Sequence, residues 1–366
     1  MEYRTLGKSG LLVSHLGFGT MRLPIGKSNP SFDQAINLIQ YAVGKGINHF
    51  DVGTFYCHGF CEEVFGEATK DIPRDRLLIS GKNTTHQSNS KSWLDQLANS
   101  LNLFHREYFD LYFLHYLDYE LWAKHFVGNK VIDQIYEAFK RGLIKHLAFS
   151  SHDSPENIRK LIDTGMFDAV LLQFNIINRR NENVLRYAHE NGLGVFTMSA
   201  LAGKALADNK LSLLTADGHG GERVSTKAVA LNYVFSQPFI HCVLVGMDSL
   251  QALDEAINVL DGERYPGEEL ENMSKLVDEE RVRLSIPCTA CQYCMPCVQG
   301  IDIPGIIDLV NQYCLLHTRS TFSRDYATMR NPAECCIACG TCIDKCPAKI
   351  DVPEIMKKAV EMFSAV

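Results

Sequence analysis

Apolar and polar positions alternate along the chain in a pattern that predicts strands and helices in turn. Short apolar runs are each followed by a stretch whose apolar residues recur at helical spacing. The predicted strands are residues 16–19, 47–52, 76–82, 109–115, 144–150, 168–174, 194–200 and 241–247. The predicted helices are residues 31–44, 61–70, 91–104, 130–140, 155–164, 181–191, 224–236 and 249–260. Strands that are apolar throughout indicate burial on both faces and parallel pairing.

Eight strand–helix units in about 250 residues predict a (β/α)8 TIM barrel. A doubly wound sheet is the competing fold, but no G-x-G-x-x-G motif opens the first helix. The stretch before residue 16 predicts an N-terminal β-hairpin that turns at residues 7–10 (GKSG). A charged helical segment at residues 263–287 follows the barrel. We therefore predict a barrel domain at residues 1–285 and a small, mostly α-helical domain at residues 286–366.

Composition and charge narrow the class of protein. The chain has 366 residues, of which 46% are hydrophobic, which is enough for one large core and one small one. The formal net charge of −7 provides no basic face for nucleic acid. No apolar run approaches the roughly eighteen residues that cross a bilayer, and the start of the chain lacks the apolar core of a signal peptide. These features predict a cytoplasmic protein that binds neither nucleic acid nor membrane.

Ten of the thirteen cysteines lie within residues 286–347. One array follows C-x2-C-x2-C-x3-C and is closed by Pro347, which is the bacterial ferredoxin spacing for a [4Fe-4S] cluster. This array is Cys336, Cys339, Cys342 and Cys346. A second array, with a last gap of two residues, is Cys288, Cys291, Cys294 and Cys297. Disulfides would require a secreted chain, and zinc sites usually use two separate pairs or mixtures with histidine.

The two arrays predict two [4Fe-4S] clusters in a ferredoxin-like domain. In such domains the last cysteine of each array usually binds the other cluster. One cluster would take Cys288, Cys291, Cys294 and Cys346. The other would take Cys297, Cys336, Cys339 and Cys342. Cys314 and Cys335 are left over. Outside this domain, Cys57 and Cys61 are either buried loop thiols, which are more common, or a redox-active pair.

Reactive side chains stand at the ends of three successive predicted strands. Asp51 lies at the end of the second strand, Lys82 ends the third and His115 ends the fourth, while Tyr56 lies five residues beyond Asp51. Each alone is often a helix cap or a core residue. Because barrel enzymes carry their chemistry at the carboxyl ends of the strands, these four side chains are expected to converge on one catalytic site.

Several motifs around these residues resemble those of the aldo-keto reductase family. They are FDVGTFYCHGFCEEVFGEA (50–68), LLISGK (77–82), DLYFLH (110–115), GLIKHLAFSSH (142–152), LQFNIINRR (172–180) and MSALAGKAL (198–206). The resemblance covers roughly residues 1–260, and the C-terminal arrays resemble those of family members that carry a ferredoxin-like tail. It implies an NAD(P)-dependent oxidoreductase that reduces an aldehyde, ketone or enone. Tyr56 would donate the proton, Lys82 would lower the pKa of Tyr56, Asp51 would hold Lys82, and His115 would orient the carbonyl oxygen.

The same resemblance implies a set of cofactor-binding residues. They are Thr20, Met21, Ser150, Ser151, Gln173, Met198, Ser199, Leu201, Gly203 and Gly246. Met198 stands where many members place an aromatic ring against the nicotinamide. Residues 245–256 contain no Lys or Arg but carry three acidic residues. Since a 2′-phosphate requires cations, the sequence favours NADH slightly over NADPH.

For the substrate and for any protein partner, the sequence predicts only a general class. The aromatic candidates for contact with a small-molecule carbonyl compound are Phe55, His58, Tyr116, Trp122 and Phe126, and the equal alternative is that these side chains belong to the core. One alternative function is electron exchange through the clusters with an external ferredoxin or flavoprotein. A further alternative is a non-enzymatic redox sensor, against which the complete set of four reactive residues argues.

Overall fold

The computed structural model describes residues 1–25, 32–83, 92–202, 206, 225–284, 286, 288, 293–316, 319–346 and 348–364. The chain forms two compact units. The first comprises Met1–Ala200 and Leu231–Tyr265, and the second comprises Leu201–Ala230 and Pro266–Val366. The charged segment after the barrel therefore groups with the C-terminal residues. The functional boundary expected at residues 285 and 286 stays a prediction.

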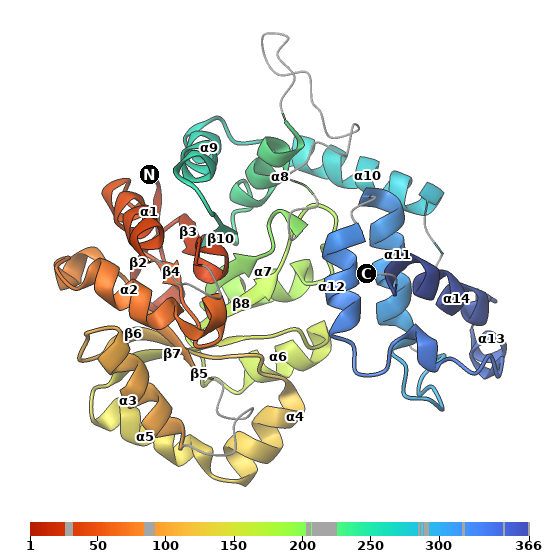
Figure 1. Cartoon of the computed structure of the whole chain (residues 1–366), viewed down its shortest axis with the longest axis horizontal. Helices are drawn as coiled ribbons and strands as arrows, with labels where there is room; N and C mark the ends of the chain where they lie inside the picture. The colour runs from red at the N-terminus through yellow and green to blue at the C-terminus, as the bar shows by residue number, and fades with distance from the viewer. Residues whose placement is uncertain are drawn as a thin grey trace. The chain divides into compact units, whose positions relative to one another are not determined.

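The first unit contains an eight-stranded parallel sheet in the order β4-β3-β10-β9-β8-β7-β6-β5 (Figure 1). The strands are β3 (Leu16–Gly19), β4 (Phe50–Asp51), β5 (Ser80–Asn83), β6 (Phe109–Leu114), β7 (Ile144–Ser150), β8 (Ala169–Gln173), β9 (Gly194–Met198) and β10 (Cys242–Gly246). The two ends of this order also meet, because His49 and Leu78 form a parallel bridge in which Leu78 N donates to Asn48 O at 2.9 Å. The sheet thus closes into the predicted barrel.

Helices alternate with these strands along the chain. They are α1 (Asp33–Gly44), α2 (Cys61–Thr69), α3 (Trp93–Leu103), α5 (Val131–Lys140), α6 (Pro155–Asp163), α7 (Glu182–Glu190), α8 (Thr226–Phe235) and α9 (Leu250–Asp261). Side-chain caps fix several starts: Ser92 accepts from Asp95 N, Ser154 from Asn157 N and Ser249 from Ala252 N. The short α4 (Tyr119–Leu121) and the π-helix η6 (Trp122–Gly128) lie between β6 and α5, where no helix was predicted.

The barrel interior is filled by apolar side chains and is closed by the N-terminal hairpin. The hairpin pairs β1 (Tyr3–Thr5) with β2 (Leu12–Ser14) in antiparallel register, and the short helix η1 (Gly7–Ser9) joins them. Leu6 and Val13 of this hairpin belong to one buried cluster with Leu111, Phe113 and Phe196 from the strands. The opposite end of the barrel, at the carboxyl ends of the strands, is therefore the open one.

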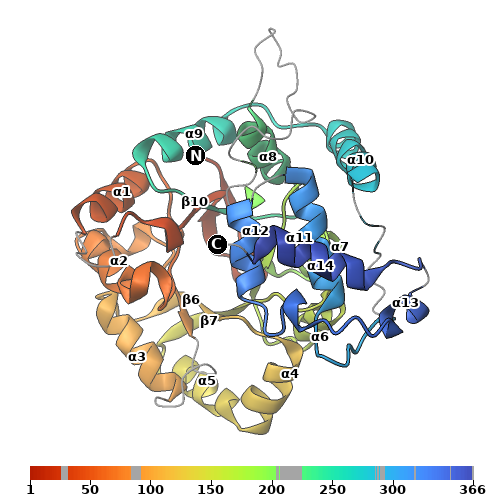
Figure 2. The ribbon, with the colours of Figure 1, turned by 45° about the vertical axis from the view of Figure 1, so that its right-hand side comes forward.

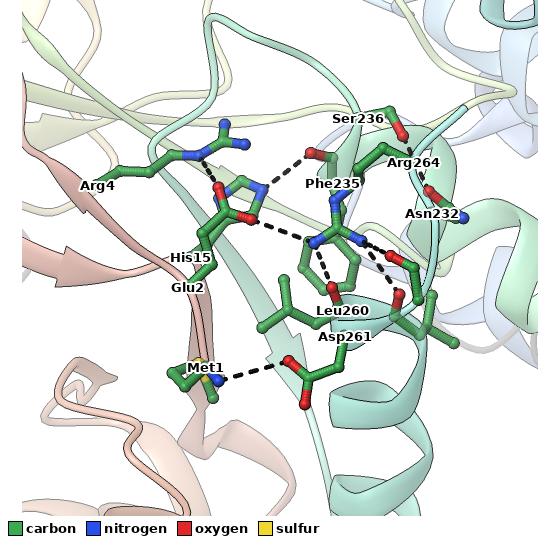
Figure 3. A network of polar contacts seen from close by, with 12 residues as sticks. Met1, Glu2, Arg4, His15, Asn232, Phe235, Ser236, Leu260, Asp261 and Arg264 are labelled. Atoms are coloured by element: carbon green, nitrogen blue, oxygen red, sulfur yellow. Dashed lines mark hydrogen bonds and ion pairs between the residues drawn. The ribbon is translucent and has the colours of Figure 1, made fainter. Parts of the chain in front are cut away.

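A polar network ties the start of the chain to the last strand–helix units (Figure 3). The Glu2 carboxylate accepts from Arg4 Nε at 2.7 Å and from Arg264 Nη2 at 3.3 Å. His15 is buried, and its ring nitrogens lie 3.0 Å from His241 O and 2.9 Å from Phe235 O. The contacts of His15 and Arg264 join residues more than 200 positions apart along the sequence, so they hold the hairpin against the final segments of the unit.

The second unit is built from helices in the part of it that the structure describes. They are α10 (Gly267–Leu284), α11 (Ile303–Leu316), α12 (Arg319–Ala327), η9 (Ala333–Cys335), α13 (Thr341–Lys345) and α14 (Val352–Phe363). Figure 2 shows α11, α12 and α14 gathered together, and their packing includes Tyr326 and Phe363, whose ring centroids are 5.3 Å apart. No helix among the described residues is both long enough and apolar enough to cross a membrane.

Candidate active site

Four polar side chains meet at the carboxyl ends of β4, β5 and β6. Asp51 ends β4, Lys82 lies in β5, His115 directly follows β6, and Tyr56 begins the short helix η3 (Tyr56–Gly59). Lys82 Nζ lies 2.5 Å from Asp51 Oδ1 and donates to Tyr56 Oη at 3.1 Å. Tyr56 Oη in turn lies 3.4 Å from Asp51 Oδ2. The structure thus brings Asp51, Lys82 and Tyr56 together, and their catalytic roles stay a prediction.

Packing around the triangle removes it from solvent. Lys82 is 2% exposed and Asp51 is 8% exposed. The Lys82 ammonium also lies over the Phe113 ring, 5.8 Å from its centroid. Gly53 leaves room for the phenol, because a β-carbon at this position would lie 3.2 Å from the Tyr56 ring. Since a buried ammonium requires a counter-charge, Asp51 fixes Lys82 where the ammonium meets the phenol oxygen.

The pKa of Tyr56 differs from the expectation. Burial is the largest cause and the Asp51 carboxylate adds to it, so the pKa of Tyr56 lies well above its ordinary value. We had expected the Lys82 ammonium to lower it. The ammonium donates to the phenol oxygen at 3.1 Å, but the Asp51 carboxylate lies only 3.4 Å from the same oxygen, and burial raises the pKa further. Tyr56 is therefore a phenol that keeps its proton at neutral pH.

A cavity of roughly 470 Å³ opens beside the phenol. Its lining is aromatic and apolar, with two imidazoles and one thiol. The lining residues are Met21, Leu23, Ile25, Phe55, Tyr56, Cys57, His58, His115 and Tyr116. The His115 ring stands edge-on to the Tyr56 ring, with centroids 6.1 Å apart. Phe55, His58 and Tyr116 thus lie where substrate contacts were expected.

Trp122 and Phe126 were also expected to touch the substrate, but they do not line this cavity. They lie four residues apart on η6, are 4% and 1% exposed, and stack on each other with centroids 5.9 Å apart. Trp122 also packs against Phe167. These two aromatic side chains are core residues, which is one of the two alternatives that the sequence left open for them.

The residues expected to bind the cofactor occupy the other arc of strand ends. Ser150 ends β7, Gln173 ends β8, Met198 ends β9 and Gly246 ends β10, while Thr20 directly follows β3. These strands are consecutive in the ring. Met21, Ser151 and Ser199 adjoin members of this arc in the sequence. Leu201 belongs to the second unit, and Gly203 lies outside the described residues.

Glycines stand at two neighbouring strand ends of this second arc. Gly246 pairs with Gly19, so two adjacent strand ends carry no side chain. A β-carbon on Gly246 would lie 3.0 Å from the side chain of Arg22. The barrel mouth therefore carries a buried acid–amine–phenol triangle on one arc and two glycines at adjacent strand ends on the other.

Comparison with known proteins identifies the family to which this barrel belongs. The model of the Aldo/keto reductase family matches residues 15–278. The chain belongs to this family. As a member, it is an NAD(P)-dependent oxidoreductase. The matched residues include the whole described barrel from β3 to α9 and stop before the cysteine arrays.

Individual relatives agree with the family match. This aldo-keto reductase is 25% identical over 307 residues to the uncharacterized oxidoreductase YqkF of Bacillus subtilis, covering 74% of this chain and 94% of that protein. It is 23% identical over 301 residues to L-galactose dehydrogenase of Arabidopsis thaliana, covering 75% and 93%. The structure of aldo-keto reductase AKR11C1 from Bacillus halodurans superposes with a TM-score of 0.63 at 22% identity, covering 75% of this chain and 96% of that one. This last likeness supports the fold.

In the second unit, cysteines from the two arrays meet at one small cavity. Cys297, Cys336, Cys339 and Cys342 all line it, together with apolar side chains that include Ile301 and Met356. Asn331 Nδ2 donates to Gly300 O at 3.0 Å and joins the two cysteine segments. Cys291 lies outside the described residues. Within the described ones, no group of three or more His, Cys, Asp or Glu side chains is already arranged to hold a metal ion.

Sequence reasoning missed Asn175, which holds two strand ends of the cofactor arc together. It is fully buried after β8, and its Nδ2 donates to Ser199 O at 2.9 Å. Its Oδ1 accepts from Ile177 N and Asn178 N at 3.1 and 2.8 Å. The motif LQFNIINRR contains this residue, but a contact across 24 positions carries no local signal.

Proposed function

We propose that this aldo-keto reductase reduces a small aldehyde, ketone or enone, with Tyr56 as the proton donor. The observation that carries the proposal is the contact of Lys82 Nζ with both Asp51 Oδ1 and Tyr56 Oη beside an open cavity. A nicotinamide cofactor supplies the hydride. The remaining requirements are a proton for the carbonyl oxygen and stabilisation of the phenolate left behind.

The described side chains meet both requirements. Tyr56 keeps its proton at neutral pH because burial and Asp51 raise its pKa. As the carbonyl carbon accepts hydride, the proton moves from Tyr56 Oη to the carbonyl oxygen. The Lys82 ammonium, at 3.1 Å, then stabilises the phenolate until solvent in the cavity returns a proton. His115 lines the same cavity and orients the carbonyl oxygen toward the phenol.

Residues on the cofactor arc would hold the nicotinamide cofactor. Ser150, Ser151 and Gln173 offer polar groups, and Met198 offers an apolar contact. We favour NADH over NADPH, because residues 245–256 contain no Lys or Arg. Arg22 lies outside residues 245–256 in the sequence, but folding places its cationic side chain beside Gly246. Fluorescence titration should show tighter binding of NADH. Tighter NADPH binding that is lost in Arg22→Ala would reverse the assignment.

We also propose that the C-terminal residues hold two [4Fe-4S] clusters in a ferredoxin-like domain. The cavity lined by Cys297, Cys336, Cys339 and Cys342 supports the crossed assignment of one cluster. Ala338 and Gly340 have positive φ angles of 53° and 75°, which allow the tight turn that directs closely spaced thiolates to one point. Cys288, Cys291, Cys294 and Cys346 would hold the other cluster.

Replacement of one phenol oxygen tests the catalytic assignment. Tyr56→Phe should lower kcat for reduction of 4-nitrobenzaldehyde by about 10²-fold or more, because general acid catalysis contributes that much. Tyr116→Phe is the matched control: it removes a phenol from the same cavity, and the rate should stay within a few-fold of the wild-type rate. Equal rates in Tyr56→Phe and wild-type protein would contradict the proposal.

A further inference from the structure

Two thiols lie next to the proton donor, and the proposed reduction does not use them. Cys57 follows Tyr56 directly, and Cys61 begins α2. Both sulfur atoms contact the same residue: Cys57 Sγ donates to Thr20 O at 3.2 Å, and Cys61 Sγ lies 2.9 Å from Thr20 Oγ1. The two thiols also hydrogen-bond to each other. Thr20 therefore holds both sulfurs within contact distance.

The two thiols differ in access. Cys57 is half-buried and lines the catalytic cavity, whereas Cys61 is fully buried. A molecule in the cavity thus reaches the sulfur of Cys57 first and reaches Cys61 only through it. The backbone directs this arrangement, because Cys57 and His58 both adopt left-handed conformations, with φ angles of 51° and 61°. Such conformations are costly for residues other than glycine and often mark functional positions.

The pKa values of the two thiols also differ: the pKa is lowered for the accessible thiol and raised for the buried one. The hydrogen bond from Cys61 is the largest influence on Cys57 and lowers its pKa, although partial burial opposes it. Burial raises the pKa of Cys61 well above its ordinary value. An accessible thiol of lowered pKa beside a buried thiol is the pattern of an attacking and a resolving cysteine.

We propose that Cys57 and Cys61 are a redox-active dithiol at the wall of the catalytic cavity, and that it reacts with small-molecule disulfides. In the first step the Cys57 thiolate attacks one sulfur of the disulfide, its S–S bond breaks, and one thiolate leaves. In the second step Cys61 attacks the Cys57 sulfur and gives its proton to the second leaving thiolate. The dithiol loses two electrons and two protons to become a disulfide, and the small molecule becomes two thiols.

Anaerobic incubation of the full chain with cystamine, followed by alkylation and peptide mass spectrometry, tests this proposal. In wild-type protein, the segment carrying Cys57 and Cys61 should lose the mass of two hydrogens. Cys242 is the internal control: it is fully buried with a raised pKa and should remain reduced. A segment that stays fully reduced, or that accumulates a stable cystamine adduct on Cys57, would overturn the proposal.

Single substitutions separate the two roles. Cys61→Ser keeps an oxygen near Thr20 but removes the resolving sulfur, so it should accumulate the mixed disulfide on Cys57. Cys57→Ser should leave Cys61 unmodified, because its sulfur is not reachable directly. Modification of Cys61 in that variant at the rate at which Cys57 reacts in wild-type protein would contradict the assigned order. These readouts are masses, so they do not depend on turnover by Tyr56.

Discussion

Lys82 Nζ and Asp51 Oδ1 form an ion pair of 2.5 Å in the mouth of the barrel, and little of either side chain reaches solvent. Removing one partner of a buried pair leaves the other charge uncompensated. Lys82→Met should therefore lower the free energy of unfolding by about 3 kcal/mol or more. Urea unfolding followed by tryptophan fluorescence reports on this unit, because both tryptophans, Trp93 and Trp122, lie within it.

An exposed ion pair provides the control for this variant. Lys70 and Glu67 form a contact three residues apart on the surface of α2 and its C-terminal end. Lys70→Met makes the same replacement and removes the same charge. It should leave the unfolding midpoint unchanged, because solvent screens exposed pairs. If Lys82→Met were as stable as Lys70→Met, the buried pair would not position the phenol as described.

The pH dependence of carbonyl reduction follows from the raised pKa of Tyr56. A proton donor stays active below its pKa and loses activity above it. With saturating cofactor, kcat/KM for reduction should therefore show no decline attributable to Tyr56 between pH 6 and about pH 9, since the unperturbed phenol already titrates near 10. A decline centred near pH 7 that is absent from Tyr56→Phe would mean that Lys82 outweighs burial.

Burial of His49 predicts a loss of stability in acid. Its imidazole is fully buried against Phe196, and burial lowers its pKa to about 4. The unfolded chain binds the proton near pH 6.5, so stability from this group is present above that pH and declines as pH falls toward 4. Between pH 7 and 5 the wild-type protein should lose about 2 kcal/mol more than His49→Phe. Equal pH slopes in urea unfolding would contradict this.

Iron content tests the crossed cluster assignment. Anaerobically purified wild-type protein should contain about eight iron atoms per chain, and Cys339→Ala should retain about four. Cys297→Ala should resemble Cys339→Ala, because both cysteines line the same cavity. Cys335→Ala is the matched control and should keep the full content. Iron loss in Cys335→Ala that equals the loss in Cys339→Ala would show that the ligand set is wrong.

The barrel was predictable because its signals are local. Apolar strands buried on both faces and amphipathic helices leave a clear pattern, and the strand-end rule placed Asp51, Lys82 and His115 together. The environment of Trp122 and Phe126 was harder to predict. Their spacing of four residues indicates one face of a helix, and Asp118 caps it by accepting from Leu121 N at 2.6 Å. Composition alone left open whether these two side chains contact substrate or belong to the core, and their burial decides for the core.

Contacts between residues far apart in the sequence could not be predicted from local patterns. Asn175 reaches the backbone of Ser199 on the neighbouring segment, a contact that no local motif reports. The direction of the Tyr56 pKa depends on how completely the site is buried, and spacing does not reveal this. The sequence also suggested no cation near the end of β10, yet folding brings Arg22 beside Gly246.

We propose that hydride passes directly from the nicotinamide to the substrate in the barrel mouth. The most direct test is reduction of 4-nitrobenzaldehyde in ordinary water with NADH deuterated on the transferred position. Direct transfer predicts one deuterium on the alcohol carbon of the product. An alcohol carbon that carries no deuterium, with one hydrogen retained from the aldehyde and one taken from solvent, would contradict this proposal and favour electron exchange through the clusters with an external partner.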